Sequence, residues 1–409
     1  MKKYLAIEKQ CKNPIILTGE MIMLNSYGFH LPTRIKIGTG ILKEAGKLAA
    51  EITTGRRAFI VTDPGVKAAG IAGRVKSSLT DAGFDCYLYE EVKPNPKDKD
   101  CERGGKEARN FEADLIVAVG GGSVIDSAKA IALLQTFGGS LAAYEGRGTV
   151  PGALTPVIAI PTTAGTGSEV TRSAVINDTK RSIKISVKDI KLTPKLAVVD
   201  PETTYTLPVG LTASTGMDAL IHAIEAYTCR KANPFSDAMA LAAMEKLYPA
   251  LPVVVDNGSN KAARTDMMIG SVMAGIAFSH ADVGAVHCLA EAVGGLYDTA
   301  HGIANSIFLP SVTAFNAEAA PVRHARAASA CGLDITNLRP EEASRRLAQE
   351  LAHISSEIGI PKFSELEKIN PQDFEYLAEI SEQNGSSESN CRSIRKNDYL
   401  KILQDCYNN

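Results

Sequence analysis

The sequence contains no tryptophan, and aromatic residues make up only 6% of its 409 residues. Aromatic platforms on which bases or sugars could stack are therefore poorly supplied. The chain also has no excess of charge of either sign, because 44 lysines and arginines stand against 46 aspartates and glutamates, a formal net charge of -2. Without a positive field to hold a polyanion, we expect no nucleic acid partner.

Closely paired cysteines and long apolar runs are also missing. The eight cysteines form no CxxC pair, which argues against a zinc-thiolate site and against a disulfide framework. No uncharged apolar run approaches the length of about 18 residues that suggests a membrane span. Glu8, Lys9, Lys12 and Glu20 interrupt the first apolar stretch, a pattern of neither a signal nor a transit peptide. We expect a soluble cytoplasmic protein with no membrane partner.

Two patterns of secondary structure divide the chain. As far as about residue 200, short β-rich runs alternate with helical stretches, which is typical of βαβ units and a parallel sheet. Predicted strands are 58–62, 86–89, 115–119 and 156–160, and predicted helices are 66–82 and 99–111. After Leu207, runs rich in Ala, Leu and Met follow helical periodicity. The sequence predicts an N-terminal extension (1–27), an α/β domain with a parallel sheet (28–206) and an all-α C-terminal domain (207–409).

A glycine triplet, Gly120-Gly121-Gly122, follows the predicted strand 115–119 and precedes Ser123 and a helix. Glycines allow close backbone approach to a diphosphate, and a helix start supplies N–H donors and a favourable dipole. The segment matches neither GxGxxG nor a P-loop. It is therefore either a phosphate cradle or a tight turn between a strand and a helix.

Hydroxyl groups and one carboxylate end two other predicted strands. The turn 161–171 gathers small and hydroxyl residues, which either bind ribose, phosphate or carboxamide or cap the next helix. Asp63 ends the strand 58–62. An acid there can accept a bond from the adenosine ribose and repel a 2′-phosphate, favouring NAD over NADP. A helix cap is the alternative role for Asp63.

Three of the seven histidines lie in apolar segments of the helical part. Asp218 and His222 are four residues apart, as are His287 and Glu291, and such pairs share a helix face. His301 stands at a predicted helix start. Asp218 with these three imidazoles could hold a divalent transition metal. The alternative is that the histidines are core residues with satisfied hydrogen bonds.

Four motifs together resemble the iron-containing (group III) alcohol dehydrogenase family, over about residues 28–405. They are GGGSVIDSAK (120–129), PTTAGT (161–166), GMDALIH (216–222) and VHCLAEAVGGLYDTAHG (286–302). The resemblance implies a dinucleotide-binding α/β domain and a helical domain with a cleft between them. It implies NAD(H) as cofactor and Fe²⁺ as metal, with Zn²⁺ as a possible occupant.

The same resemblance assigns residues to the site. It implies metal ligands at Asp218, His222, His287 and His301. It implies cofactor contacts at Asp63, Asn95, Gly121, Gly122, Ser123, Thr162, Thr163, Thr166, Thr171 and Lys184.

Two positions depart from the family pattern. Where many members have a second histidine four residues after the third ligand, this chain has Glu291, which leaves three roles open: proton relay, extra ligand or substrate determinant. A relay would need a raised pKa, which a neighbouring metal cation opposes. His280 stands where the family has asparagine, and it is either a substrate contact or a surface histidine.

The expected function is hydride transfer between NAD(H) and a small alcohol or aldehyde, with Glu291 and His280 as candidate catalytic residues. A polyol dehydrogenase, such as a glycerol dehydrogenase, and a dehydroquinate-synthase-like lyase are alternatives on the same scaffold, and a non-catalytic binding protein is a third. Against a lyase for a phosphorylated substrate, the three histidines are flanked mainly by Ala, Leu, Ile and Gly. Arg172, His280 and Glu291 suggest a substrate with a second polar or anionic group. We expect a homo-oligomer, at least a dimer.

Overall fold

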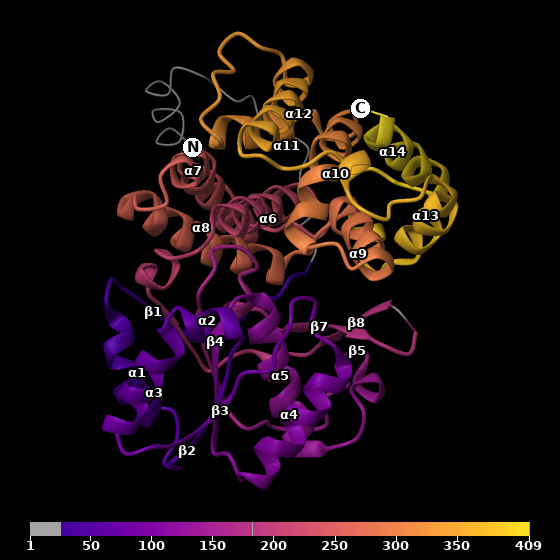
Figure 1. The fold of residues 1–409 in the computed structure, drawn as a ribbon. Coiled ribbons are helices and arrows are strands. Elements are labelled where there is room, and N and C mark those ends of the chain that lie inside the picture. Colours follow the sequence, from indigo (N-terminus) through magenta and orange to yellow (C-terminus); the bar gives the residue numbers. More distant parts are fainter. Residues whose placement is uncertain (1–25, 182, 409) are drawn as a thin grey trace.

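The computed structural model of the protein describes residues 26–181 and 183–408. A half built on β-sheet is followed by a helical half, which lies above it in Figure 1. The fold class predicted from the sequence is confirmed. The expected extension 1–27 lies outside the described residues except for Ser26 and Tyr27.

Six parallel strands form the main sheet, in the order β1-β9-β6-β4-β2-β3. They are β1 (Arg34–Ile37), β2 (Arg57–Val61), β3 (Asp85–Tyr89), β4 (Leu115–Gly120), β6 (Val157–Pro161) and β9 (Leu196–Val199). A smaller sheet, in the order β5-β8-β7, contains β5 (Gly146–Arg147), β7 (Ser173–Asp178) and β8 (Ile183–Lys188). All four predicted strands are present, with bounds that differ by one residue at one or both ends.

Helices cover both faces of the main sheet, as parallel sheets require. The helices of this half are α1 (Ala45–Ala50), α2 (Pro64–Ala68), α3 (Ile71–Asp81), α4 (Asp98–Asn110) and α5 (Gly122–Phe137). Every residue of β4 is buried. Leu115, Val117 and Val119 pack with α1 and α3, whereas Ile116 and Ala118 pack with α4 and α5. This alternation explains why the strand is a continuous apolar run.

The prediction of one helix over 66–82 is wrong. The structure has two helices, α2 and α3, separated at Gly70, whose φ of 75° is left-handed. The Gly70 N–H donates to the Lys67 carbonyl at 2.9 Å, which closes α2. Glycine adopts this conformation without the steric cost that a Cβ would bring.

The described part of the chain from Val209 onward contains helices and no strand. The helices are α6 (Val209–Thr228), α7 (Pro234–Asp256), α8 (Lys261–His280), α9 (Ala285–Tyr297), α10 (His301–Ala317), α11 (Pro321–Ala330), α12 (Pro340–Glu357), α13 (Phe374–Gln383) and α14 (Lys396–Asn408). One large apolar core joins them. By length and composition α7 could cross a membrane, and so could α8 and α9 taken as one bent span. One face of α7 belongs to this core, however, and one such helix is weak evidence for a membrane span.

The two halves meet at a contact between two glycines. Gly167 lies in the loop after β6 with a φ of 59°, and Gly275 lies in α8. A Cβ built on Gly275 would lie 2.8 Å from the Gly167 Cα and 2.9 Å from its carbonyl oxygen. Backbone therefore packs on backbone here, and no side chain fits between the loop and the helix.

We expect Gly275→Ala to lower the free energy of unfolding by about 1–3 kcal/mol, because the added methyl group overpacks the contact. Gly73→Ala is the control: Gly73 lies within α3, and a Cβ there meets no atom within 4 Å. This second change should stabilise the protein by roughly 1 kcal/mol through helix propensity. Urea unfolding midpoints measure both effects, and a Gly275→Ala protein as stable as the wild type would contradict the packing argument.

Candidate active site between the two halves

The crevice for a ligand lies where the strand order reverses. After β2 and β3 the chain crosses to β4 on the other side of β2, and then continues outward through β6 and β9. In doubly wound sheets, ligands bind at the carboxyl ends of the strands at such a point. Here these ends carry Asp63 after β2 and the glycine triplet after β4. The Thr62 hydroxyl donates to the Val119 carbonyl at 2.8 Å and ties the two strand ends together.

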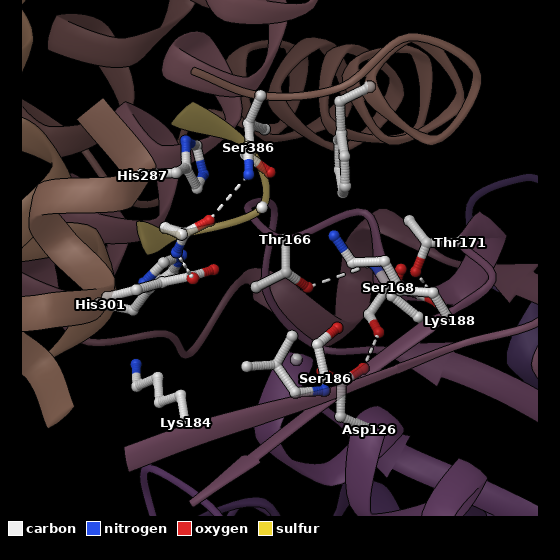
Figure 2. A pocket seen from close by; sticks show the side chains of 18 of the residues that line it. Asp126, Thr166, Ser168, Thr171, Lys184, Ser186, Lys188, His287, His301 and Ser386 are labelled. Atoms are coloured by element: carbon white, nitrogen blue, oxygen red, sulfur yellow. Dashed lines mark hydrogen bonds between the residues drawn. The ribbon is translucent and has the colours of Figure 1, made fainter. Parts of the chain in front are cut away.

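A cavity of about 520 Å³ opens between this edge of the sheet and the helical half. That volume is within the usual range for small-molecule sites. Figure 2 shows the hydroxyl side chains of Thr166, Ser168 and Thr171 on one side and His287 and His301 on the other, with Lys184 below His301. Lys184, Ser186 and Lys188 alternate along β8 and all line the cavity. The Ser186 hydroxyl is buried without a hydrogen-bond partner.

The glycine triplet forms the start of α5 at the cavity wall. Gly121 caps the helix, while Gly122 and Ser123 begin it and line the cavity. Their N–H groups belong to the first turn, which has no partners within the helix and is suited to an anion. A Cβ on Gly122 would lie 2.5 Å from the Thr166 side chain, and one on Gly121 would lie 3.1 Å from that of Thr163. Because Gly121 and Gly122 have no side chains, the start of α5 can pack closely against the loop that follows β6.

Four of the other predicted cofactor residues line the cavity, and Asp63, Thr162 and Thr163 do not. Asn95, Thr166, Thr171 and Lys184 line the cavity. Thr162 and Thr163 lie behind its wall, where Thr162 N–H donates to the Gly120 carbonyl. The Asp63 carboxylate accepts from Val66 N–H at 2.9 Å. The helix-cap role is thus present, and one carboxylate oxygen accepts no bond that would prevent it from binding a ribose.

Three polar contacts join the sheet half to the helical half beside the cavity. Asn95 Nδ2 donates to the Asp298 carboxylate at 2.9 Å, and Lys97 Nζ lies 3.1 Å from the same oxygen. Arg147 pairs with Asp282 at 3.7 Å. Asp298 and Arg147 are exposed, so these ion pairs contribute little to stability. Asp282 is buried and also accepts from Lys231 and Ser389.

A buried lysine supports the segment between β6 and β7. Lys129 of α5 is fully buried, and its ammonium group donates to the Ser168 and Thr171 hydroxyls and to the Ser173 carbonyl, at 2.7–3.1 Å. Burial lowers the pKa of Lys129. The neighbouring Glu169 is also buried, and this burial raises its pKa to about 7.

Three helices bring the predicted metal ligands together. Asp218 and His222 come from α6, His287 from α9, and His301 begins α10. Candidate ligand atoms of Asp218, His222 and His287 all lie within 4.8 Å of one another. His301 Nε2 lies 3.8 Å from Asp218 Oδ1. The side chains of the first three are at most 6% exposed, whereas His301 is 29% exposed and lines the cavity.

The chemistry of this donor set fits a metal. Burial lowers the pKa of His222 to about 4 and that of His301 to about 3. Both imidazoles are therefore neutral near pH 7, the form that binds a metal ion. Nδ1 of His222, Nδ1 of His301 and Oδ1 of Asn305 are buried without hydrogen-bond partners. Such unsatisfied atoms are costly unless something binds them.

Glu291 lies one helical turn after His287 and lines the cavity. Asn384, which follows α13, donates its amide N–H to the carboxylate at 2.6 Å. Gln383, Asn384 and Ser386 also line this part of the cavity. The wall near the metal ligands is therefore polar.

His280 is not brought to the cavity. Its neighbours Ser279 and Ala281 line the cavity, whereas the His280 ring nitrogens lie 2.8 Å from the Ile276 carbonyl oxygen and 3.0 Å from that of His30. The ring also stacks on Phe29 with centroids 4.1 Å apart. Its observed role is to hold the segment before β1 against α8.

Sequence reasoning missed Glu225, Asn305 and Asn384. Glu225 bonds to His287 at 2.6 Å, and Asn305 Nδ2 lies within 3.3 Å of Asp218, His287 and His301. Helical spacing was an available signal for two of them, because Glu225 is three residues after His222 and Asn305 is four after His301. Asn384 is distant in sequence and carries no such signal.

Comparison with known proteins gives consistent matches along the chain. Residues 32–201 match the family model "Iron-containing alcohol dehydrogenase", and residues 212–407 match "Fe-containing alcohol dehydrogenase family, C-terminal". The chain is 38% identical over 377 residues to the NAD-dependent methanol dehydrogenase of Bacillus methanolicus, covering 92% of this chain and 99% of that protein. It is 38% identical over 355 residues to the 1,3-propanediol dehydrogenase of Citrobacter freundii, covering 86% and 92%. A crystal structure of 1,3-propanediol oxidoreductase superposes with a TM-score of 0.90 at 35% identity, covering 93% and 100%.

The burial of Glu169 predicts a pH dependence of stability. Its pKa is about 7 in the folded state against a usual 4.5, so between these values the folded state binds more protons than the unfolded state. Stability therefore falls as pH rises from about 4.5 to about 7, by about 1.4 kcal/mol per pKa unit of difference, and then levels off. We expect Glu169→Gln to remove this part of the slope.

Urea unfolding at pH 5 and pH 8 measures the effect. Glu245→Gln is the matched control, since Glu245 is exposed on α7 and its removal should leave the slope unchanged. Equal slopes in the Glu169→Gln and wild-type proteins would show that burial does not hold the proton on Glu169.

Proposed function

The chain belongs to the iron-containing alcohol dehydrogenase family, and on this basis we propose that its cavity transfers hydride between NAD(H) and a small alcohol or aldehyde. One observation carries the proposal. A helix start suited to a diphosphate and a buried cluster of one carboxylate and three imidazoles face the same cavity. We assign cofactor binding to residues 28–206 and metal binding to residues 207–409, which is supported by the change from sheet to helices between Val199 and Val209.

The first turn of α5 holds the diphosphate of the dinucleotide. Gly122 and Ser123 offer their N–H groups there, and the hydroxyls of Thr166 and Thr171 line the same wall. Asn95 and Lys184 line the same cavity. The Lys184 ammonium group would lie 3.1 Å from a Cβ built on Gly294, so it packs against α9, the helix that carries His287. Thr162 and Thr163 act by supporting the glycine turn. Asp63, at the reversal of strand order, selects NAD over NADP.

Asp218, His222, His287 and His301 hold the metal, which we propose is Fe²⁺, with Zn²⁺ as the alternative. The neutral imidazoles of His222 and His301 support this assignment, as does the unpartnered Nδ1 of His222, which lies 3.8 Å from Asp218 Oδ2. A bound divalent ion supplies a Lewis acid that polarises the oxygen of an alcohol or aldehyde. Phe278 stacks on His222 with centroids 4.2 Å apart and fixes the imidazole plane at the cavity wall.

The substrate carries a second polar group. Glu291 and Asn384 line the cavity one turn from His287, and Asn384 donates to one carboxylate oxygen and so leaves the other for a ligand. This arrangement favours Glu291 as a substrate determinant and favours a second hydroxyl group, which can donate to the carboxylate, over an anionic group. Arg147, Arg172 and Lys188 line the cavity as well and keep an anionic group as the alternative to be tested.

We further propose a cytoplasmic homo-oligomer, at least a dimer. β1 is an edge strand of the main sheet, and its last residue, Ile37, is 44% exposed. Exposed strand edges are surfaces on which chains pair.

Removal of the metal tests the proposed reaction. Chelator-treated protein should form no NADH from NAD⁺ with 1-propanol or 1,3-propanediol, and added Fe²⁺ or Zn²⁺ should restore it. Full turnover by the metal-free protein would contradict the proposal. Net NADH formation separates the dehydrogenase from a lyase, which regenerates its cofactor in each cycle. A higher kcat/KM for the diol than for the mono-alcohol is expected, and an ω-anionic aldehyde with NADH is the competing substrate.

Asp63→Asn tests cofactor choice. Asparagine caps helices as well as aspartate does, so the bond to Val66 N–H can be kept while the charge that repels a 2′-phosphate is removed. We expect the ratio of kcat/KM for NAD⁺ to that for NADP⁺ to fall by about tenfold, or about 1.4 kcal/mol. An unchanged ratio would place the selection elsewhere.

A further inference from the structure

Glu225 contacts one of the proposed metal ligands, and each of its carboxylate oxygens makes a hydrogen bond. Glu225 lies on α6 and is only 4% exposed. Its Oε1 accepts from Val286 N–H at 2.8 Å, and its Oε2 lies 2.6 Å from Nδ1 of His287. A buried carboxylate is tolerated only when it is hydrogen-bonded in this way. Glu225 thus joins α6 to the His287 imidazole by a hydrogen bond.

We propose that Glu225 is a positioning residue that fixes the tautomer of His287 for metal binding; the inference rests on the metal site of the proposed function. An ionised carboxylate can only accept hydrogen bonds. The proton of neutral His287 therefore resides on Nδ1, and Nε2 keeps its lone pair. Nε2 is also the atom that faces Asp218, 3.9 Å from Oδ1.

An independent contact agrees with this tautomer. Nδ2 of Asn305, an obligate donor, lies 3.3 Å from Nε2 of His287 and 2.7 Å from Oδ1 of Asp218. The two amide hydrogens of Asn305 are shared among these two atoms and Nε2 of His301, 3.1 Å away, and an accepting Nε2 on His287 is compatible with this arrangement. Carboxylates that bind the far nitrogen of a metal-ligating histidine hold the ring in orientation and increase its basicity.

Glu225 also positions the helix that carries His287. The first N–H groups of α9 lack partners within the helix. Glu225 accepts from Val286, and Asn390 Oδ1 accepts from Ala285 N–H at 3.3 Å. Gly284 precedes the helix, and a Cβ there would lie 3.0 Å from Glu225 Oε1. A purely structural role as a helix cap is therefore the competing explanation, and the test must separate the two.

The variant Glu225→Gln distinguishes control of the His287 tautomer from capping of α9. Val286 N–H can only donate, so it takes the single carbonyl oxygen of glutamine. The amide NH₂ then faces Nδ1 of His287, which must accept, and the proton moves to Nε2. We expect metal affinity to fall by about 10- to 100-fold, measured for Zn²⁺ by competition with a chelator. Asn390→Ala is the matched control: it removes the other cap of α9 but leaves Glu225 on His287, so it should lower stability and keep metal affinity within a few fold.

The tautomer is read directly in metal-free protein with ¹⁵N-labelled histidine, at a pH where the imidazoles are neutral. We expect the His287 proton on Nδ1 in the wild type and on Nε2 in Glu225→Gln, with the signal assigned by its loss in His287→Asn. Wild-type His287 with its proton on Nε2, as a protonated Glu225 would impose, overturns the proposal. So does a folded Glu225→Gln protein that binds Zn²⁺ as tightly as the wild type.

If Glu225→Gln does not fold, the position of the His287 proton in the wild-type protein alone tests the role of Glu225. This measurement needs no metal. A wild-type protein that binds neither Fe²⁺ nor Zn²⁺ would therefore count against the proposed function, while the position of the proton would still decide the role of Glu225.

Discussion

The site depends on a contact from which side chains are excluded. Gly167 and Gly275 let the loop after β6 touch helix α8 backbone to backbone, and this contact sets how near the sheet half and the helical half can come. On either side of it lie the residues that face each other across the cavity: the start of α5 with its hydroxyl neighbours, and the imidazoles of α6, α9 and α10. A larger residue at either position would increase the distance between the start of α5 and the imidazoles, which on the proposed function bind cofactor and metal in one cavity.

Charge is arranged differently in the two halves. The helical half places Asp218 and Glu225 in its core, where Glu225 is held by hydrogen bonds. Asp218 lies beside His222 and His301, whose imidazoles burial keeps neutral, and beside His287, whose pKa is raised by the bond to Glu225 in spite of its burial. The sheet half buries a cation, Lys129, behind the segment between β6 and β7. Hydroxyl and carbonyl oxygens accept its hydrogen bonds, and the Asp126 carboxylate lies 3.5 Å from its ammonium group. Each buried charge holds together elements from different parts of the chain, and the near-zero net charge of the sequence hides this arrangement.

Much of this could be predicted from the sequence because it is encoded locally. The spacing of Asp218 and His222 puts both on one helix face, and the apolar run before the glycine triplet is a strand buried on both sides. What could not be predicted depends on contacts between distant segments. Nothing in the sequence near Glu291 indicates the amide of Asn384, and nothing near His280 indicates that its ring bonds to the His30 carbonyl. The break at Gly70 was missed because glycine is tolerated within helices and only the surrounding packing decides its conformation.

Three of the four proposed metal ligands are almost completely enclosed, and the fourth, His301, is reached from the cavity. The cavity that the dinucleotide would occupy is therefore also the route by which an ion reaches its ligands. On the proposed function, a bound dinucleotide would lie across the path of an ion entering or leaving the cluster, so loss of the metal would be slower with the dinucleotide bound.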